Sequence, residues 1–344
     1  MNDLSPRKVA IDPEWIPHIY SADGADLTFV HVPRKKRADL TFLSDEHYKA
    51  QFPKKTFPAA AITPALDGVE SSPLHFIFHT SFCCSTLLVQ ALDIPGLAVG
   101  LKEPEVLVHL ANRFVRGDDS SNRRRLELVL RLLARPFDRG EAVIVKPSNF
   151  ANRLILPALD ANPASRAVLL YSDMPTFLRS LVKRGLFGRI FGRNLYSYVA
   201  SWTPLNLGYT PAETFCQTDL QIAGLAWLMQ VHHISEAARK LGRDRVMIVD
   251  SADFTANVAT TLDKIADFFG IALGSPAAAK IAAGPVFARH SKFSQRDYSF
   301  GAREQEHSKA EDAHGEEIDM VVKWVETVAA HMQVPLQPKV PATS

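Results

Sequence analysis

The chain has 344 residues, 47% of them hydrophobic and 22% charged, with a formal net charge of +2, values typical of one large or two modest globular domains. Global charge therefore gives no reason to expect a nucleic-acid partner, and no apolar run approaches the ~20 residues that cross a bilayer. Three cysteines, two of them adjacent, do not form a disulfide framework, and the N-terminus lacks an apolar signal core, so we expect a cytoplasmic protein with no membrane partner.

Residues 1–70 are predicted to form an N-terminal extension with short strands. The alternation of apolar and polar residues in Asp26–Val32 indicates one strand, and Ala38–Leu43 is a candidate for a second. The basic run Pro33–Arg37 lies between them. We interpret it as a solvated hairpin turn, and a patch for an acidic ligand is the alternative.

Beyond this extension, short apolar strands alternate with helical patterns. Near-continuous apolar strands separated by helices predict an α/β domain over residues 71–300, with a mainly parallel central sheet flanked by helices in three layers. Residues 301–344 are expected to form a C-terminal helix and a flexible tail. Ligands of such sheets bind at the carboxyl ends of the strands. The expected strands are Leu74–Phe78, Leu97–Leu101, Glu141–Lys146, Arg166–Tyr171 and Arg245–Val249.

The stretch His75–Asp93 reads HFIFHTSFCCSTLLVQALD and joins a short apolar strand to a helical pattern through small polar residues. A strand that turns sharply into a helix leaves N–H groups that bind anions. An ordinary buried strand, loop and helix is the alternative. The Walker pattern is absent because His79, Cys84 and Ser85 stand at its first glycine, second glycine and lysine. A plain ATPase or GTPase is therefore not expected.

The same stretch resembles the 5′-phosphosulfate loop of sulfotransferases, in which a strand ends in Thr-x-x-(Lys/Arg)-Ser-Gly-(Thr/Ser)-Thr and runs into a helix. The run from Ser85 to Leu88 fits the end of that pattern, whereas Phe82 stands at the family's catalytic Lys or Arg and Cys84 at its Gly. The resemblance implies a P-loop-type fold and the donor 3′-phosphoadenosine 5′-phosphosulfate (PAPS). It assigns donor binding to Thr80, Ser81, Phe82, Cys83, Cys84, Ser85 and Thr86.

A second resemblance lies in Leu169–Ser180, which reads LLYSDMPTFLRS. Sulfotransferases have a strand here, then Arg-(Asp/Asn)-Pro, and a helix with a Ser eight residues after the Arg; the Arg and the Ser hold the 3′-phosphate of PAPS. Ser180 occupies the serine position, but Ser172 replaces the Arg and the proline comes one residue late, at Pro175. A serine brings no charge to a phosphate. Ser180 has the alternative interpretation of a small residue on a helix face.

A third segment, Arg289-His290-Ser291-Lys292, resembles the part of bacterial sulfotransferases that closes over the donor. The resemblance implies that Arg289 and Lys292 supply the charge missing at Phe82 and Ser172. A solvated basic loop is the alternative.

Sulfuryl transfer needs a base to take the proton of the acceptor. Glu103, at the carboxyl end of the second strand, is our candidate, and Lys146 is the candidate for the positive charge missing at Phe82. Glu105 and His109 share a helical face and are reserve bases. The alternatives are that Glu103 complements a helix dipole and that Lys146 pairs with a carboxylate.

The cysteine and histidine residues give no evidence of a covalent mechanism or a metal site. Cys83 and Cys84 lack the Cys-x5-Arg loop of phosphatases, because Val89 and Gln90 stand at the arginine position, so small cysteines that pack the turn are favoured over nucleophilic thiols. His79 is either a hydrogen-bond donor at the site or a core histidine. Adjacent histidines such as His232 and His233 point apart on a helix, and no metal is expected.

Together these residues predict a cytoplasmic sulfotransferase that moves a sulfuryl group from PAPS to a hydroxyl or amine of a small molecule or glycan. A catalytically inactive P-loop relative that binds a nucleotide or phosphorylated ligand is one alternative, favoured by Phe82 and Ser172. A small-molecule kinase is another. The acceptor and the oligomeric state stay open.

Overall fold

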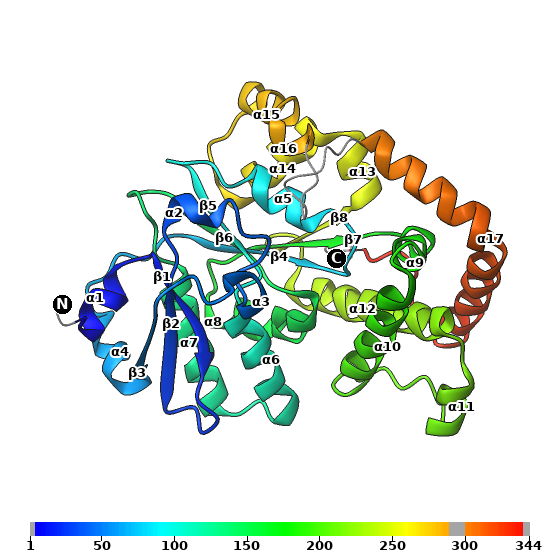
Figure 1. Cartoon of the computed structure of the whole chain (residues 1–344), viewed down its shortest axis with the longest axis horizontal. Helices are drawn as coiled ribbons and strands as arrows, with labels where there is room; N and C mark the ends of the chain where they lie inside the picture. Colours follow the sequence, from blue (N-terminus) through cyan, green and yellow to red (C-terminus); the bar gives the residue numbers. More distant parts are fainter. Residues whose placement is uncertain (1–3, 289–299, 340–344) are drawn as a thin grey trace. The chain divides into compact units, whose positions relative to one another are not determined.

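The structure is a computed structural model that describes residues 4–288 and 300–339. Within these residues the central sheet is parallel and has five strands in the order β5-β6-β4-β7-β8, flanked by helices (Figure 1). This architecture confirms the predicted α/β class. The strands are β4 Leu74–His79, β5 Ala98–Lys102, β6 Ala142–Lys146, β7 Ala167–Tyr171 and β8 Val246–Asp250.

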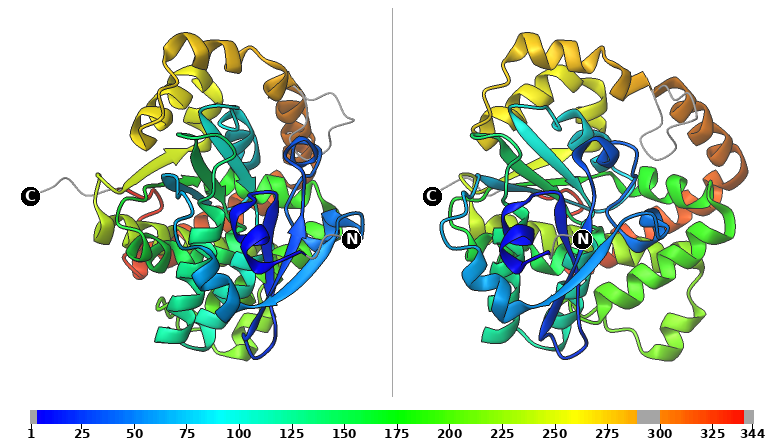
Figure 2. Two further views of the ribbon diagram at one scale, coloured as in Figure 1. Left: turned by 90° about the vertical axis from the view of Figure 1, so that its left-hand side faces the viewer. Right: turned by 60° about the vertical axis from the view of Figure 1, so that its left-hand side comes forward.

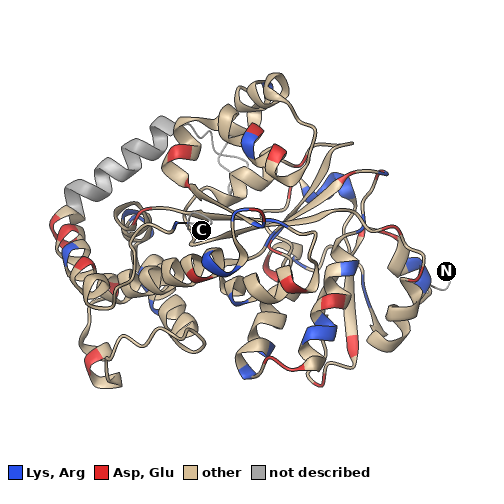
Figure 3. Cartoon of the chain, turned by 180° about the vertical axis from the view of Figure 1, so that it is seen from behind, with Lys and Arg blue, Asp and Glu red and all other residues tan. Residues whose placement is uncertain are grey.

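The burial of these strands explains their sequences. Every residue of β4, β5, β6 and β7 is buried, which requires near-continuous apolar runs rather than alternation. In β8, at one end of the sheet order, only Val246 and Val249 are buried, whereas β5 at the other end is covered along its whole length. Both charge signs are spread along the rest of the chain, in keeping with its small net charge of +2 (Figure 3).

The chain divides into two compact units, and each is described by itself. The first unit comprises Met1–Phe78, Thr86–Ala167 and Ala259–Arg296, and the second comprises His79–Ser85, Val168–Val258 and Asp297–Ser344. The helices of the first unit are α1 Pro6–Ile11, α2 Arg34–Arg37, α3 Asp45–Tyr48, α4 Ala59–Ala65, α5 Ser85–Ala91 apart from its first residue, α6 Glu105–Arg116, α7 Ser120–Leu133, the 3-10 helix η1 Asn149–Leu154, α8 Ile155–Ala161, α14 Val258–Phe269 apart from its first residue, α15 Ser275–Ala282 and α16 Pro285–Ala288.

The N-terminal part of the first unit contains an antiparallel sheet, β1 Trp15–Tyr20, β2 Asp26–His31 and β3 Lys54–Pro58 (Figure 2). The predicted strand at Asp26–Val32 is thus confirmed. The predicted strand at Ala38–Leu43 is wrong, because this segment consists of turns and bends. Instead, Leu43 N donates to Lys102 O at 2.8 Å and Leu43 O accepts from Glu105 N at 3.1 Å, so the backbone covers the end of β5.

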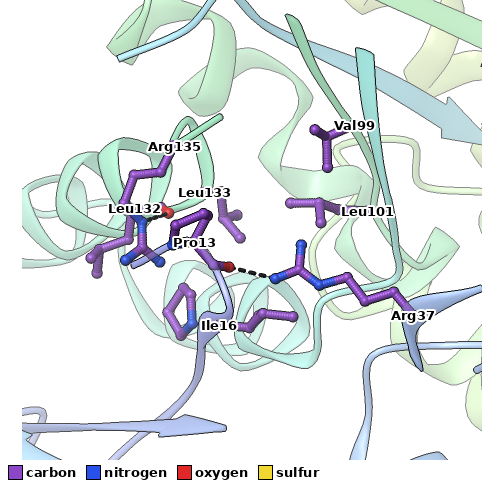
Figure 4. A pocket seen from close by; sticks show the side chains of 9 residues that line it. Pro13, Ile16, Arg37, Val99, Leu101, Leu132, Leu133 and Arg135 are labelled. Atoms are coloured by element: carbon purple, nitrogen blue, oxygen red, sulfur yellow. Dashed lines mark hydrogen bonds between the residues drawn. The ribbon is translucent and has the colours of Figure 1, made fainter. Parts of the chain in front are cut away.

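The basic run Pro33–Arg37 forms helix α2, and its interpretation as a solvated turn is wrong. Arg34 pairs with the fully buried Glu141 at 2.6 Å. The buried Arg37 donates to the carbonyl oxygens of Val32 and Pro13 (Figure 4). Both guanidinium groups also lie over the Phe137 ring, at 4.6 and 4.7 Å from its centroid. Arg34 and Arg37 therefore connect the N-terminal extension to residues 137–141 of the same unit.

His75 in β4 makes the stability of the first unit sensitive to acid. Its ring stacks on Phe269 with centroids 4.7 Å apart, and Nδ1 accepts from Arg166 N at 3.2 Å. Burial, with a further contribution from Arg166, lowers the pKa of His75 from 6.5 to about 4. Between pH 6.5 and about pH 4, His75 is therefore protonated in the unfolded chain but neutral in the folded chain. Because the unfolded state binds the additional proton, the free energy of unfolding falls as the pH falls through this range.

We expect the unfolding free energy to fall by about 3 kcal/mol between pH 6.5 and about pH 4. The variant His75→Phe keeps an aromatic ring on Phe269 but does not titrate. Urea unfolding between pH 4 and 7 should therefore give a flatter pH profile for His75→Phe than for the native chain. His331→Gln, at an exposed position, should keep the native profile, and an unchanged acid limb in His75→Phe would contradict the assignment.

The second unit is built around the long helix α12 Asp219–Leu241. Thr218 caps it through a capping box with Gln221. Helix α10 Gly185–Ala200 approaches α12 closely at Gly192, where an added Cβ would lie 2.9 Å from the Cβ of Ala223. The remaining helices are α9 Met174–Val182, α11 Pro211–Cys216, α13 Ser251–Ala256 and α17 Phe300–His331. The last lies in the region where the sequence predicts a C-terminal helix.

Candidate functional site

Glu103 and Lys146, the two residues predicted for catalysis, form an ion pair in the first unit. Strands β5 and β6 run parallel with Lys102 opposite Lys146, so the two strands end side by side. Glu103 follows β5 directly, and its N–H donates to Lys146 O at 2.7 Å. The prediction that these two residues lie together at the carboxyl edge of the strands therefore agrees with the geometry, and so does the alternative that Lys146 pairs with a carboxylate.

The pair is unequally exposed. The Lys146 side chain is 1% exposed and the Glu103 side chain 18%, so the carboxylate is the member that solvent or a ligand can reach. Lys146 Nζ lies 5.3 Å from the centroid of the Phe42 ring. Glu103 has φ +50°, a left-handed conformation that is strained for a residue with a Cβ. Such strain is often retained where a side chain has to be held in one direction.

A second lysine, Lys102, is the last residue of β5 and directly precedes Glu103. Lys102 is buried and donates to Ala38 O at 3.3 Å. Burial lowers the pKa of Lys102 to about 8. The end of β5 is thus covered by the segment of the extension that contains Ala38, Phe42 and Leu43.

The predicted reserve bases are engaged elsewhere in the first unit. Glu105 Oε2 accepts from Asp45 N at 2.7 Å, and Glu105 Oε1 lies 3.8 Å from His109 Nε2. Glu105 also lies beside His18. The helical face shared by Glu105 and His109 is confirmed.

In the second unit, the loop after β4 has an unusual backbone. Ser81, Phe82 and Cys84 have φ values of +77°, +54° and +63°, although none of them is glycine. Thr80, Ser81 and Ser85 are buried. Three left-handed residues with side chains in one short loop indicate a conformation that the surrounding structure imposes.

The loop packs against the segment that follows β7. Thr80 N donates to Leu170 O at 3.2 Å, and Cys83 Sγ lies 3.6 Å from the same oxygen. Ser172 N lies 3.4 Å from Thr80 Oγ1. Hence the two segments that carry the sulfotransferase resemblance are in contact. The buried Cys83 packs the turn, as the sequence favours.

Two residues of α12 complete this cluster. Trp227 Nε1 donates to Ser172 O at 2.9 Å, and Gln230 Nε2 approaches Thr80 O at 3.5 Å. Among the described residues, neither Ser172 Oγ nor Gln230 Oε1 has a hydrogen-bond partner, although both atoms are buried. Buried polar atoms are nearly always paired. A polar ligand or water can therefore form hydrogen bonds with Ser172 Oγ and Gln230 Oε1.

Phe82 is held in an aromatic cluster. Its ring lies 5.7 Å from Phe177 and 5.4 Å from Phe191. The guanidinium of Arg184 lies over the Phe82 ring, 4.8 Å from the centroid. A positive charge is thus present beside the residue that stands at the family's catalytic Lys or Arg.

The sequence analysis did not identify Arg184, Trp227 or Gln230. Arg184 lies in the turn between α9 and α10, so its four-residue separation from Ser180 does not place the two on one helical face and gave no signal. Trp227 and Gln230 are three residues apart in α12 and give no local signal of their own.

The other predicted donor residues are placed as follows. Ser180 is buried on α9, in the second unit. Thr86 is buried on α5 and belongs to the first unit. His79 is buried, and its Nδ1 accepts from Ser81 N at 3.1 Å, so it helps to shape the loop. Arg289 and Lys292 lie outside the described residues.

Among the described helices none is long and apolar enough to span a bilayer. No family model and no curated protein matches the chain.

Several solved sulfotransferase structures are similar to this chain. A sulfotransferase domain from the curacin biosynthetic pathway has 12% identity and a TM-score of 0.43, covering 77% of this chain and 98% of that one. A sulfotransferase from Alicyclobacillus acidocaldarius has 14% identity and a TM-score of 0.38, with the coverages 77% and 98%. A mouse sulfotransferase complexed with PAP has 16% identity and a TM-score of 0.35, and the match covers 61% of this chain and 64% of that one. At these TM-scores the similarity carries no argument about chemistry.

Proposed function

We propose that this protein is a sulfotransferase that transfers a sulfuryl group from PAPS to a hydroxyl or amine of a small molecule or glycan. The observation that carries the proposal is the contact between the loop after β4 and the segment after β7, through Thr80, Leu170 and Ser172. These two segments independently resemble the parts of sulfotransferases that hold the 5′- and 3′-phosphates of the donor. Their contact in one unit supports a common ligand.

The loop conformation supports binding of a phosphate. Left-handed residues interspersed among ordinary ones turn successive backbone N–H groups to one side, an arrangement that binds anions. Phe82 and Cys84, which are left-handed on either side of Cys83, supply this alternation, and Ser81 is left-handed as well. The unpaired Ser172 Oγ and Gln230 Oε1 add polar atoms that a ligand or water can satisfy.

Arg184 supports the electrostatic part of the proposal. Phe82 and Ser172 are uncharged where the family has basic residues, and a donor with several phosphate charges needs compensating cations. Arg184 lies over the Phe82 ring. We propose that its guanidinium replaces the charge lost at Phe82.

Glu103 supports the acid–base part. Acceptor deprotonation needs a carboxylate or imidazole that a substrate can reach, and Glu103 is partly exposed while Lys146 is buried beside it. We propose that Glu103 takes the acceptor proton and that Lys146 holds the carboxylate in position.

Calorimetric titration with 3′-phosphoadenosine 5′-phosphate (PAP), the product of the donor, tests the proposal, with ATP as the comparison ligand. We expect binding of PAP and a much weaker response to ATP. Arg184→Met should weaken PAP binding by about 10- to 100-fold, the usual value of a charged hydrogen bond. Ser180→Ala should weaken it less. Arg239→Met removes a cation that is paired with Glu236 on the surface of α12 and should bind PAP like the native chain.

The absence of PAP binding would contradict the sulfotransferase proposal. Binding of ATP in its place would support a small-molecule kinase. An equal loss in Arg184→Met and Arg239→Met would show that the effect is one of global charge.

A second candidate is a catalytically inactive relative that binds a phosphorylated ligand. The packing of Phe82 between Phe177 and Phe191 favours it, because an aromatic ring cannot stabilise a transferring group. PAP binding with no sulfuryl transfer to any acceptor in a broad screen would support this candidate.

A further inference from the structure

A group of three potential metal ligands lies in the N-terminal part of the first unit, apart from the residues assigned to sulfuryl transfer. One nitrogen of His18 and one carboxylate oxygen each from Asp45 and Glu105 lie within 4.8 Å of one another. His18 belongs to β1, Asp45 begins α3 and Glu105 begins α6 (Figure 1). Three separate elements thus direct electron-donating atoms to one place.

His18 supplies an independent sign of a ligand. Its side chain is 1% exposed, and its Nε2 lies 2.9 Å from Asp45 Oδ1. Its Nδ1 is buried without a hydrogen-bond partner among the described residues and lies 3.8 Å from Glu105 Oε2. In a neutral imidazole whose Nε2–H donates to Asp45, Nδ1 carries a lone pair. That lone pair then faces a carboxylate, and two electron-rich groups meet with no proton between them.

We propose that His18, Asp45 and Glu105 bind one divalent transition-metal ion of the Zn²⁺ class. An imidazole nitrogen with carboxylate oxygens suits Zn²⁺, whereas Mg²⁺ and Ca²⁺ prefer all-oxygen sites. Ligand atoms of a tetrahedral Zn²⁺ site stand about 3.3 Å apart, given bond lengths of about 2.0 Å. One ion binds one nitrogen of His18. Because Glu105 lies beside Nδ1 and Asp45 beside Nε2, metal binding requires one of the two carboxylates to turn toward the other side of the ring. Asp45 is largely exposed, which leaves water access to the fourth position.

The neighbouring charges fit this proposal. Lys54 Nζ pairs with Asp45 Oδ1, and this ammonium is the group a metal ion has to displace. The Lys54 side chain is 40% exposed, so it can turn into solvent at little cost. On the other side, His109 Nε2 lies 3.8 Å from Glu105 Oε1, the oxygen that does not face His18, and orients the carboxylate.

The ion would act as a structural clamp. His18 and Asp45 are 27 residues apart, and Asp45 and Glu105 are 60 apart. A shared metal would therefore tie the N-terminal sheet and α3 to the start of α6. Because metal binding to the folded state adds to its stability, occupancy should raise the melting temperature.

Titration of the metal-free full-length chain with ZnCl₂, followed by calorimetry and thermal melting, tests the proposal. We expect one ion bound at this site and a higher melting temperature. Asp45→Asn and Glu105→Gln, at positions that are not fully buried, should each weaken the binding by at least about 10- to 100-fold, the range seen for residues that merely support a ligand. Lys54→Met should tighten it by about fivefold, because the competing ammonium is removed.

His47→Ala is the matched control, since His47 lies on α3 beside the group but contacts Ser44 and Phe42 instead. It should bind Zn²⁺ like the native chain. Titration with Co²⁺ reports the ligands through visible absorption, and strong near-ultraviolet thiolate bands would place the ion on a cysteine. Binding that survives in both Asp45→Asn and Glu105→Gln, or that is lost in His47→Ala, would overturn the proposal.

Discussion

Glu103→Gln is expected to lower the rate of sulfuryl transfer by about 10²- to 10⁴-fold, the usual contribution of a general base, while PAP binding is unchanged. The amide has nearly the shape of the carboxylate and can still accept a hydrogen bond from Lys146, but it cannot take a proton. The strained backbone at Glu103, with φ +50°, is imposed by its surroundings, so the side chain should keep its direction in the variant.

The measurement is the initial rate of transfer from PAPS to an acceptor, with PAP affinity determined in parallel. Glu127→Gln, at an exposed position on α7, should leave the rate unchanged. Lys146→Met should also lower the rate, because it removes the partner of Glu103. A Glu103→Gln variant with native activity would exclude Glu103 as the base, and a loss of PAP binding would mean that the variant disturbs the protein more widely.

Arg135→Leu is expected to destabilise the first unit by about 3–5 kcal/mol, because several buried backbone carbonyl groups lose their charged hydrogen-bond donor. Arg135 is buried and donates to five backbone carbonyl oxygens, those of Leu132, Val9, Ala10, Asp12 and Trp15. Burial lowers its pKa to about 9. Figure 4 shows its guanidinium beside Pro13 and Leu132 at a small cavity that Arg37 also lines.

Removing this side chain leaves several of those carbonyl groups without a donor, and leucine cannot replace it. Urea unfolding of the variant, followed by circular dichroism, gives the change in unfolding free energy. Arg131→Leu, in the last turn of α7 just before Arg135, is the control: Arg131 is about half exposed, reaches Leu66 O only at 3.4 Å and lies 3.9 Å from Asp67. It should cost less than about 1 kcal/mol. Equal losses in the two variants would contradict the role assigned to Arg135.

The central strands were predictable because each is buried along its whole length. A run such as Ala142–Lys146 is apolar at every position up to its last residue, and this local pattern is sufficient to identify a strand of a covered parallel sheet. The long helix Asp219–Leu241 was predictable for a similar reason, since it is buried without a break from Ile222 to Val231 and Thr218 marks its start. The placement of Glu103 and Lys146 at one edge followed from the rule that parallel strands end at one edge, whereas their direct pairing depends on β5 and β6 being neighbours.

The N-terminal extension was less predictable. Pro33–Arg37 has the composition of a solvated turn, yet Arg34 and Arg37 are held by Glu141, Phe137 and backbone carbonyls. The predicted strand at Ala38–Leu43 fails for a related reason, because the backbone of Leu43 bonds to the end of β5 rather than to a strand of its own sheet.

The sequence by itself determined the α/β class, the positions of the five central strands along the chain, and the position of a polar loop after β4. The tertiary structure alone decided which residues meet. It placed Arg184 over Phe82, across 102 residues of sequence, and it brought His18, Asp45 and Glu105 together from three elements. The physical reason is that local patterns record burial and backbone preference. Contacts between distant residues depend on how the elements pack and leave no periodic trace in the sequence.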